Sequence, residues 1–419
     1  METDPNPDPT SQNGQKYLGA KGLLVFLAFL SAFIPLSTDL YLPALPGMAG
    51  YFQAPVKLVN LTLVAFFVFY AVSTLFWGPM SDKYGRKPIM VIGLLIYTLA
   101  SILCARSGNI FQLIAFRILQ AVGGGGATAV ATAVVKDVYS GRKRESVLAI
   151  IQVMVIIAPI LAPVIGAILL GFTSWRGIFW ALAGISLIAL AASALLEETS
   201  NSRFDGTWWQ TIGRLGVVLK NPGFTALLLT FSPTAMSMMA FIAASSYIYI
   251  QGFGLSEQSF SYFFAFNAGC AMSGPMVYLF FSRRFRRRSI IITCFAAIAM
   301  SGLVVFGLGN HSPYVFALSL VPTTLAGSAL RAPSTNLMLE QQRQDAGSAA
   351  SLITCSALFM GSIGMMLISM PWGDRIRALG MIITTIGVVC GGLWLLISKK
   401  TFVKGLPESN TPAVSESLR

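Results

Sequence analysis

The stretch "GPMSDKYGRKP", Gly78 to Pro88, joins two long apolar segments at about 58–79 and 88–105. It places three cations around one acid, Asp82, and then changes direction at Gly85. Glycine suits a tight reversal, the final proline suits the first turn of the next helix, and the acid lies near that helix's positive end. A short charged turn between two such segments predicts two membrane-spanning helices that meet at a water-facing surface.

The rest of the chain follows the same plan. Of its 419 residues, 55% are hydrophobic and only 11% are charged, a composition typical of an integral membrane protein. Apolar runs long enough to cross a bilayer occur about twelve times. The sequence therefore predicts an all-α membrane protein with twelve transmembrane helices, at about 23–45, 58–79, 88–105, 110–135, 146–170, 176–196, 224–250, 256–281, 289–309, 313–335, 347–370 and 376–397.

The net charge of +13 comes from 29 Lys and Arg residues that are unevenly placed. Most lie in the two tails, 1–22 and 398–419, and in every second connection between spans. This bias predicts that both termini are cytoplasmic. The basic stretch "SRRFRRRS", residues 282–289, then sets topology and touches anionic lipid, and we expect no nucleic-acid partner.

The longest polar interruption, 197–223, divides the spans six and six into an N-terminal half, 23–196, and a C-terminal half, 224–397. An offset near 200 residues aligns the basic turn after the second span with the basic turn after the eighth. Two helical halves joined by a cytoplasmic linker are the plan of a carrier in which two units rock around a midplane site. Neither a channel nor an enzyme needs this arrangement.

Two charged side chains lie deep inside the predicted spans: Asp39, in "STDLYLPALP", and Arg117. Each would cost about 2.5 to 3.5 kcal/mol at a helix centre, so neither should face lipid. Counting ~1.5 Å per residue places both in the outer half of the bilayer, close enough in depth to approach directly or through water. A structural ion pair remains the alternative to a protonatable carboxylate in a water-filled cavity.

A single cavity carboxylate suits coupling to protons, because its proton affinity can change when the cavity opens to the other side. The equivalent position in the C-terminal half falls near Ala240, so the predicted carrier is asymmetric. Arginine cannot release its proton at usable pH and can only tune or neutralise the carboxylate. Further residues expected to line an apolar substrate cavity are Thr38, Tyr41, Gln120, Gln152, Phe241, Tyr247 and Asn267.

Other patterns carry less chemistry. The run "GGGG", 123–126, lacks the lysine of a phosphate loop and indicates close helix packing. Pro159 and Pro163 predict a kinked or pliable fifth helix, with Gly166 behind them. The five cysteines and the single histidine form no metal-ligand spacing, so we expect no metal and no cofactor.

At this point a resemblance to a known family becomes definite. "GPMSDKYGRKP" resembles the signature loop of the major facilitator superfamily, "LIAFRILQAVGGG" its helix-four motif, and "APILAPVIGA" its antiporter motif in helix five. With "STDLYLPALP" they resemble the Bcr/CflA branch of bacterial drug/proton antiporters, which includes bicyclomycin and chloramphenicol exporters. The chain has Ala121, Ala162 and Ala167 where glycine is common in these motifs.

The resemblance implies roles for particular residues. Arg117 would be an essential charge linked to proton handling, and Asp39 would sit where proton and drug alternate. Pro159, Pro163 and Gly166 would mark the helix associated with antiport. The signature loop would form a cytoplasmic latch that stabilises the outward-facing state, through Gly78, Asp82, Gly85, Arg86 and Lys87.

We therefore expect a non-enzymatic carrier in a bacterial cytoplasmic membrane, a monomer surrounded by lipid. It would export a small amphipathic compound, such as a chloramphenicol- or bicyclomycin-like drug, in exchange for protons. A carrier that exports a metabolite such as a siderophore, nucleoside or sugar is the alternative. A membrane-embedded enzyme would need paired carboxylates, a Ser/His pair or metal-ligand spacing, which this sequence lacks.

Overall fold

A computed structural model describes residues 17–199, 208–342 and 346–400. Within these ranges every regular element is a helix, and twelve helical segments are long and apolar enough to cross a membrane. The first half of the chain contains α1 (Gly19–Ser31), α2 (Phe33–Asp39), η1 (Leu42–Ala44), α3 (Leu45–Tyr51), α4 (Val56–Tyr84), α5 (Arg86–Ala105), α6 (Ile110–Val138), α7 (Gly141–Phe172) and α8 (Trp175–Ala194).

The second half repeats this plan with similar lengths. A short helix, α9 (Trp208–Leu219), lies within the segment 197–223 and leads into it. The remaining elements are α10 (Pro222–Phe231), α11 (Thr234–Ser246), η2 (Tyr247–Gly252), α12 (Glu257–Ser282), α13 (Arg287–Leu308), α14 (Pro313–Glu340), α15 (Ala346–Ile368) and α16 (Arg375–Ile397).

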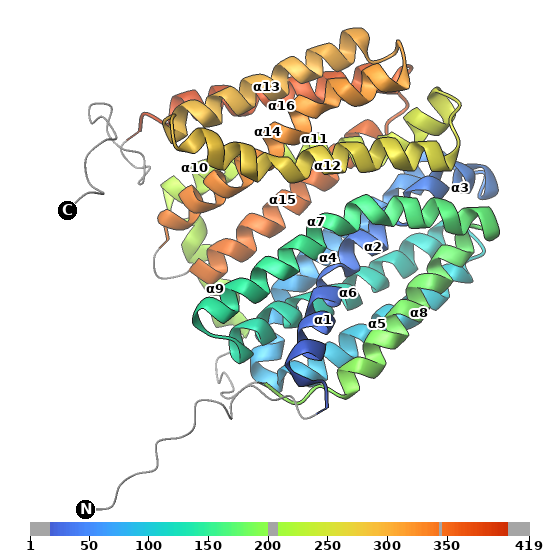
Figure 1. Cartoon of the computed structure of the whole chain (residues 1–419), viewed down its shortest axis with the longest axis vertical. Helices are drawn as coiled ribbons and strands as arrows, with labels where there is room; N and C mark the ends of the chain where they lie inside the picture. The colour runs from blue at the N-terminus through green and yellow to red at the C-terminus, as the bar shows by residue number, and fades with distance from the viewer. Residues whose placement is uncertain (1–16, 200–207, 343–345, 401–419) are drawn as a thin grey trace, which may run out of the picture.

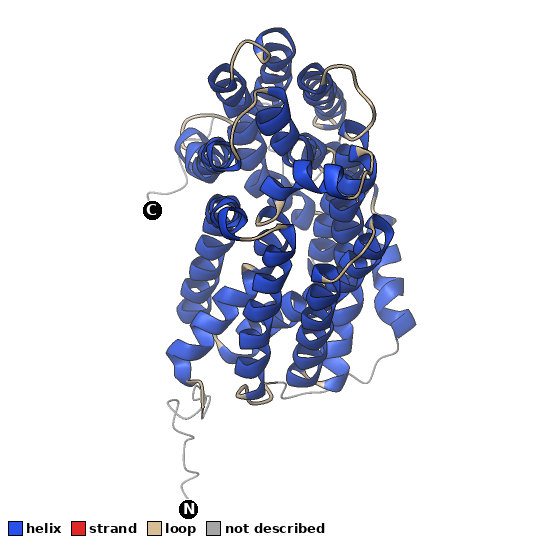
Figure 2. Ribbon diagram, turned by 90° about the vertical axis from the view of Figure 1, so that its right-hand side faces the viewer, coloured by secondary structure: helices blue, strands red, loops and turns tan. Residues whose placement is uncertain are grey.

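The helices form one bundle in which the two halves lie side by side (Figure 1). The ribbon in Figure 2, turned by 90°, shows the same helices joined by loops. We call the end where Tyr17 and Lys400 lie the terminal end and the opposite one the distal end. Contacts between the halves run mainly along two helix pairs, α4 with α15 and α7 with α12. These four helices therefore form the seam on which one half could move against the other.

Two spans are interrupted. The first is broken between α1 and α2 at Ala32, and the seventh is broken between α10 and α11 at Ser232 and Pro233, which is the same position at an offset of 200 residues. A second break lies only in the first span, where α2 ends at Asp39 and η1 begins at Leu42. In the C-terminal half, α11 continues without a break across the matching positions. The extra break is thus a feature of one half alone.

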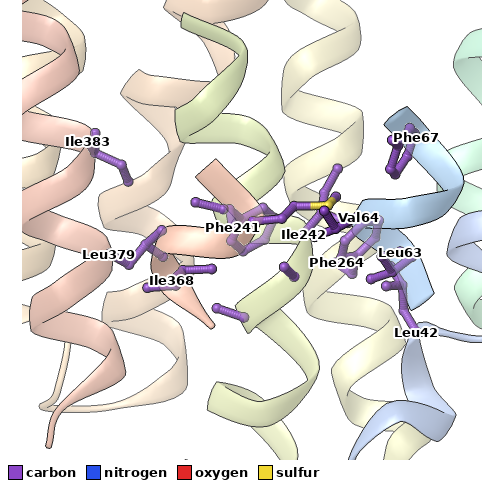
Figure 3. Close-up of a cluster of buried hydrophobic side chains, with 14 of the residues drawn as sticks. Leu42, Leu63, Val64, Phe67, Phe241, Ile242, Phe264, Ile368, Leu379 and Ile383 are labelled. Atoms are coloured by element: carbon purple, nitrogen blue, oxygen red, sulfur yellow. The ribbon is translucent and has the colours of Figure 1, made fainter. Parts of the chain in front are cut away.

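A large apolar core joins the halves toward the distal end. Figure 3 shows its side chains reaching in from both halves, among them Leu42, Leu63 and Val64 from the first and Phe241, Ile242 and Phe264 from the second. Polar contacts reinforce the core there. Asn60 Nδ2 at the start of α4 donates to Ser369 Oγ at 2.8 Å and to the Ala243 carbonyl at 3.3 Å.

Candidate functional site

Asp39 lies at the second break of the first span, which the local sequence explains. Pro43 follows within one turn and has no N–H for a continuing α-helix, so the chain passes into the short helix η1. Asp39 is buried, and Thr38 Oγ1 donates a hydrogen bond to its Oδ1 at 3.0 Å. Among the described residues Asp39 forms no ion pair, and it is therefore a buried carboxylate held by one hydroxyl.

Arg117 is fully buried on α6 and reaches the same break. Its Nη1 donates to the Ser37 carbonyl at 3.0 Å and to Gln120 Oε1 at 2.6 Å. The Ser37 carbonyl is one of the last four of α2, which have no partner within the helix, and a cation at that end is favoured. Arg117 thus binds the backbone beside Asp39 and not the carboxylate itself. Its Nε and Nη2 are buried without a hydrogen-bond partner among the described residues.

Aromatic rings complete the surroundings of this guanidinium. Its carbon lies 4.3 Å from the centre of the Phe66 ring and 4.8 Å from that of Tyr41. Cations are stabilised over aromatic faces, most strongly where water is excluded. The rings therefore accommodate a buried charge that has no carboxylate partner, and Asp39 stays available for another cation or a proton.

A network of hydroxyls and amides ties this region to the neighbouring helices. Gln120 Nε2 donates to Ser101 Oγ on α5 at 2.8 Å, and Ser37 Oγ is hydrogen-bonded to the Tyr97 hydroxyl on the same helix. The Tyr41 hydroxyl lies 2.6 Å from Thr62 Oγ1 on α4. Sequence reasoning did not single out Ser37, Thr62, Tyr97 or Ser101. Tyr97 and Ser101 are four residues apart and so lie on one face of α5. This spacing is the one sequence pattern that could have pointed to them.

The glycine of the fifth span packs directly on the break. A Cβ added at Gly166 would lie 1.8 Å from the Leu40 carbonyl oxygen, so only glycine permits this approach of α7 to α2. Pro159 and Pro163 lie inside α7, two turns and one turn before it. From the other half, Ser261 Oγ on α12 donates to the Pro163 carbonyl at 2.9 Å. The predicted antiporter helix thus contacts both the Asp39 region and the opposite half.

Among the described residues, no hydrogen bond links the remaining predicted cavity residues to Asp39. Phe241 stacks on Phe264, with ring centres 5.8 Å apart. Tyr247, in η2, lies under the Arg375 guanidinium, and its buried hydroxyl has no partner among the described residues. Asn267 Nδ2 donates to the Phe263 carbonyl at 3.2 Å. Gln152, by contrast, is exposed on α7.

The signature loop forms a separate polar cluster at the terminal end. Arg86 Nε binds Asp137 Oδ2 on α6 at 2.8 Å, and its Nη1 is paired with Asp82 on α4. Gly85 has φ of +103°, a backbone conformation that favours glycine. Glu198 accepts from the Arg86 N–H at 2.8 Å and the Lys87 N–H at 3.2 Å, which caps α5.

Sequence reasoning placed Asp82, Gly85, Arg86 and Lys87 in this cluster but missed two carboxylates, Asp137 and Glu198. Both are far away along the chain, so no local pattern pointed to them. An added Cβ at Gly78 would meet nothing within 4 Å, so its place in the motif has no packing explanation here. Lys87 Nζ donates to the Ala194 carbonyl at the end of α8, at 2.8 Å.

Comparison with known proteins places this arrangement in context. The profile described as Major Facilitator Superfamily matches residues 25–365. The chain is 30% identical over 359 residues to an "Uncharacterized MFS-type transporter YdgK" of Bacillus subtilis, covering 84% of this chain and 88% of the relative. It is 25% identical over 288 residues to a "Multidrug resistance protein MdtL" of Salmonella typhimurium, covering 68% and 73% of the two chains.

Solved structures share the fold at low sequence identity. A bacterial homologue of the human lysosomal transporter Spinster, in an inward-facing and occupied conformation, superposes with a TM-score of 0.72 at 14% identity, covering 90% of this chain and 97% of that one. A mutant of the nucleoside transporter NupG has a TM-score of 0.72 at 12% identity, covering 90% and 100%. At these identities the likeness concerns the fold alone.

Proposed function

Because the chain belongs to the major facilitator superfamily, we propose that it is a proton-coupled antiporter that exports small amphipathic compounds. Its place would be the Bcr/CflA branch, in a bacterial cytoplasmic membrane with both termini in the cytoplasm. The observation that carries the proposal is the environment of Asp39. It is a buried carboxylate at a helix break, and it forms no ion pair among the described residues.

Such a carboxylate is suited to exchange. A buried charge without a cation is costly, so the group favours either a bound proton or a bound cationic or hydrogen-bonding ligand. Thr38 can donate to the carboxylate, while Arg117 holds the backbone beside it. Proton and substrate would then alternate at one group as the halves rock. With an uncharged substrate, one proton moving inward adds about 2.3 kcal/mol per 100 mV of membrane potential.

The cargo is proposed as drug-like for two reasons. The relative MdtL is named a multidrug resistance protein, and the large core beside Asp39 is apolar and aromatic, which suits amphipathic molecules better than sugars. Export of a metabolite such as a siderophore, nucleoside or sugar is the competing proposal. A compound panel that contains both kinds of cargo separates the two.

The test measures proton release from energised everted vesicles when antibiotics or metabolites are added. Wild type should release protons with one or more amphipathic antibiotics, and Asp39→Asn should give no release, because an amide cannot take up a proton. Glu257→Gln is the matched control, since Glu257 is exposed at the distal start of α12. It should behave as wild type.

Two results would count against the proposal. If Asp39→Asn releases protons as wild type does, Asp39 is not the coupling group. A response of wild type to metabolites only would replace drug export with metabolite export.

A further inference from the structure

A groove of about 390 Å³ lies in the C-terminal half, well separated along the chain from Asp39. Residues of α12 and α13 form its walls and residues of α14 form its floor, and α14 packs against both of these helices (Figure 1). At the terminal end it begins beside Phe281, Phe285 and Ser289, where α12 turns into α13. From there it reaches Ala297 and Pro322, deeper in the bundle.

The N-terminal half shows why this space is open. At an offset of 200 residues, Trp77 on α4 takes the place of Val277 in the groove wall. The Trp77 indole donates to the Val122 carbonyl at 2.8 Å, and a Cβ added at Gly126 would lie 3.3 Å from its ring. Val122 and Gly126 match Pro322 and Ala326, which line the groove. A tryptophan therefore fills in one half the space that a valine leaves empty in the other.

The terminal mouth of the groove is strongly basic. Phe285 lines the groove and is 52% exposed, and it stands between Arg284 and Arg286 in the chain. The side chains of Arg283, Arg284 and Arg286 are exposed and form no ion pair with any other described residue. Arg287, by contrast, is paired with Glu340 at 3.3 Å. Three arginines without an ion-pair partner among the described residues thus lie close to Phe285 in the chain, at the terminal end of the groove.

Three residues with hydroxyl groups also line the groove, in its part nearer the terminal end. Tyr278, Ser289 and Thr293 line the groove, and within the described ranges their hydroxyls have no hydrogen-bond partner in the protein. Below them the lining is apolar, with Cys294, Ala297 and Leu325. The basic residues thus lie at the terminal end of a mostly apolar groove, as the phosphate lies at one end of the acyl chains in a phospholipid.

We propose that this groove binds one anionic phospholipid from the leaflet at the terminal end. Its acyl chain would lie between α12 and α13 on the floor made by α14. Its phosphate and acidic headgroup would be held by Arg283, Arg284 and Arg286, since guanidinium groups pair well with phosphate. Basic pockets between transmembrane helices are suited to such headgroups, and the apolar walls supply the affinity for the chain.

Native mass spectrometry of the detergent-purified full chain tests the proposal. The protein is titrated with phosphatidylglycerol and, separately, with phosphatidylethanolamine of the same acyl chains. Wild type should retain one phosphatidylglycerol at a concentration about tenfold below that needed for phosphatidylethanolamine. Val277→Trp, which copies the tryptophan of the other half, should lose this tight binding because the indole fills the groove.

Val388→Trp is the matched control, since Val388 is 61% exposed on α16, outside the groove. It should bind phosphatidylglycerol as wild type does. A second variant, Arg283→Gln/Arg284→Gln/Arg286→Gln, keeps the groove and should bind the two lipids equally. The proposal is overturned if Val277→Trp retains phosphatidylglycerol as wild type does. It is equally overturned if wild type does not distinguish the two lipids, or takes up only detergent at this site.

Discussion

Arg117 lies beside the proposed proton site without contacting the Asp39 carboxylate by an ion pair or a hydrogen bond. Its guanidinium binds the Ser37 carbonyl and Gln120 together, and it lies against the rings of Phe66 and Tyr41. A flat, delocalised cation can do all of this at once, whereas the lysine ammonium is a compact point charge. We therefore expect this position to need an arginine, because a lysine could not make all of these contacts.

We expect Arg117→Lys to lower the rate of substrate-induced proton release by about tenfold or more, because a lost hydrogen bond to a charged group is worth about 1.5 to 3 kcal/mol. Arg176→Lys is the control. Arg176 also donates to two oxygens, Tyr51 Oη and the Ser107 carbonyl, and lies over an aromatic ring, but at the distal surface. It should retain most of the activity. Equal rates in the two variants would contradict a specific role for Arg117.

The sequence indicated which residues of the candidate site are unusual, but it did not predict which residues they contact. Asp39 and Arg117 stood out because charges are costly inside a membrane. Counting residues along the helices placed both side chains at a similar depth in the bilayer. The partners of Arg117, however, depend on how α6 is rotated about its axis, which the sequence does not reveal. Arg117 meets the Ser37 carbonyl, which exists as an open acceptor only because α2 ends there. Serine, threonine and tyrosine partners were missed because such residues are ordinary in membrane helices.

At the scale of elements, the contact of α7 with the break after α2 is the closest packing near Asp39. Glycine at 166 allows the Leu40 carbonyl to touch the backbone of α7. Twelve spans were predicted from apolar runs, and the structure has twelve helical segments that are long and apolar enough to cross a membrane. The break at residues 40–41 was not predicted, although Pro43 and Pro46 stand just beyond it. Prolines at the end of a span are compatible with either a straight helix or a broken one.

Gly166→Ala should push α7 away from α2, since its Cβ would lie 1.8 Å from the Leu40 oxygen. Overpacking of this kind costs about 1 to 3 kcal/mol, so we expect a lower melting temperature in detergent and loss of transport. Gly171→Ala, in the same helix, has nothing within 4 Å of the added Cβ. That variant should melt at or slightly above the wild-type temperature. If the two alanine variants melt and transport alike, the contact does not constrain α7.

At the scale of the whole molecule, hydrogen bonds join the two halves toward the distal end. Asn60 of the first half binds Ser369 and Ala243 of the second, and Ser261 of the second half binds the Pro163 carbonyl of the first. The arrangement holds the distal side together. If the halves rock during transport, these contacts must break in each cycle.

A short thiol-reactive cross-linker between Asn60→Cys and Ser369→Cys should therefore stop transport in proportion to the fraction of protein cross-linked. The control is a cross-link within one half, between Tyr51→Cys and Arg176→Cys, whose native side chains are 2.9 Å apart. That protein should keep transporting, because the half moves as a unit. Continued transport by fully cross-linked 60/369 protein would mean that the distal side does not open.

The second break of the first span has no counterpart in α11, and the positions matching Arg117 and Gln120 at the same offset are Ala317 and Leu320. Under the proposed function, proton coupling then depends on the N-terminal half, and the C-terminal half takes no direct part in it. Under the same proposal, substitutions in the C-terminal half would change which compounds are recognised without disturbing the proton step. A carrier built in this way would acquire new cargoes by single substitutions, which would be an advantage for a cell that meets unfamiliar toxins.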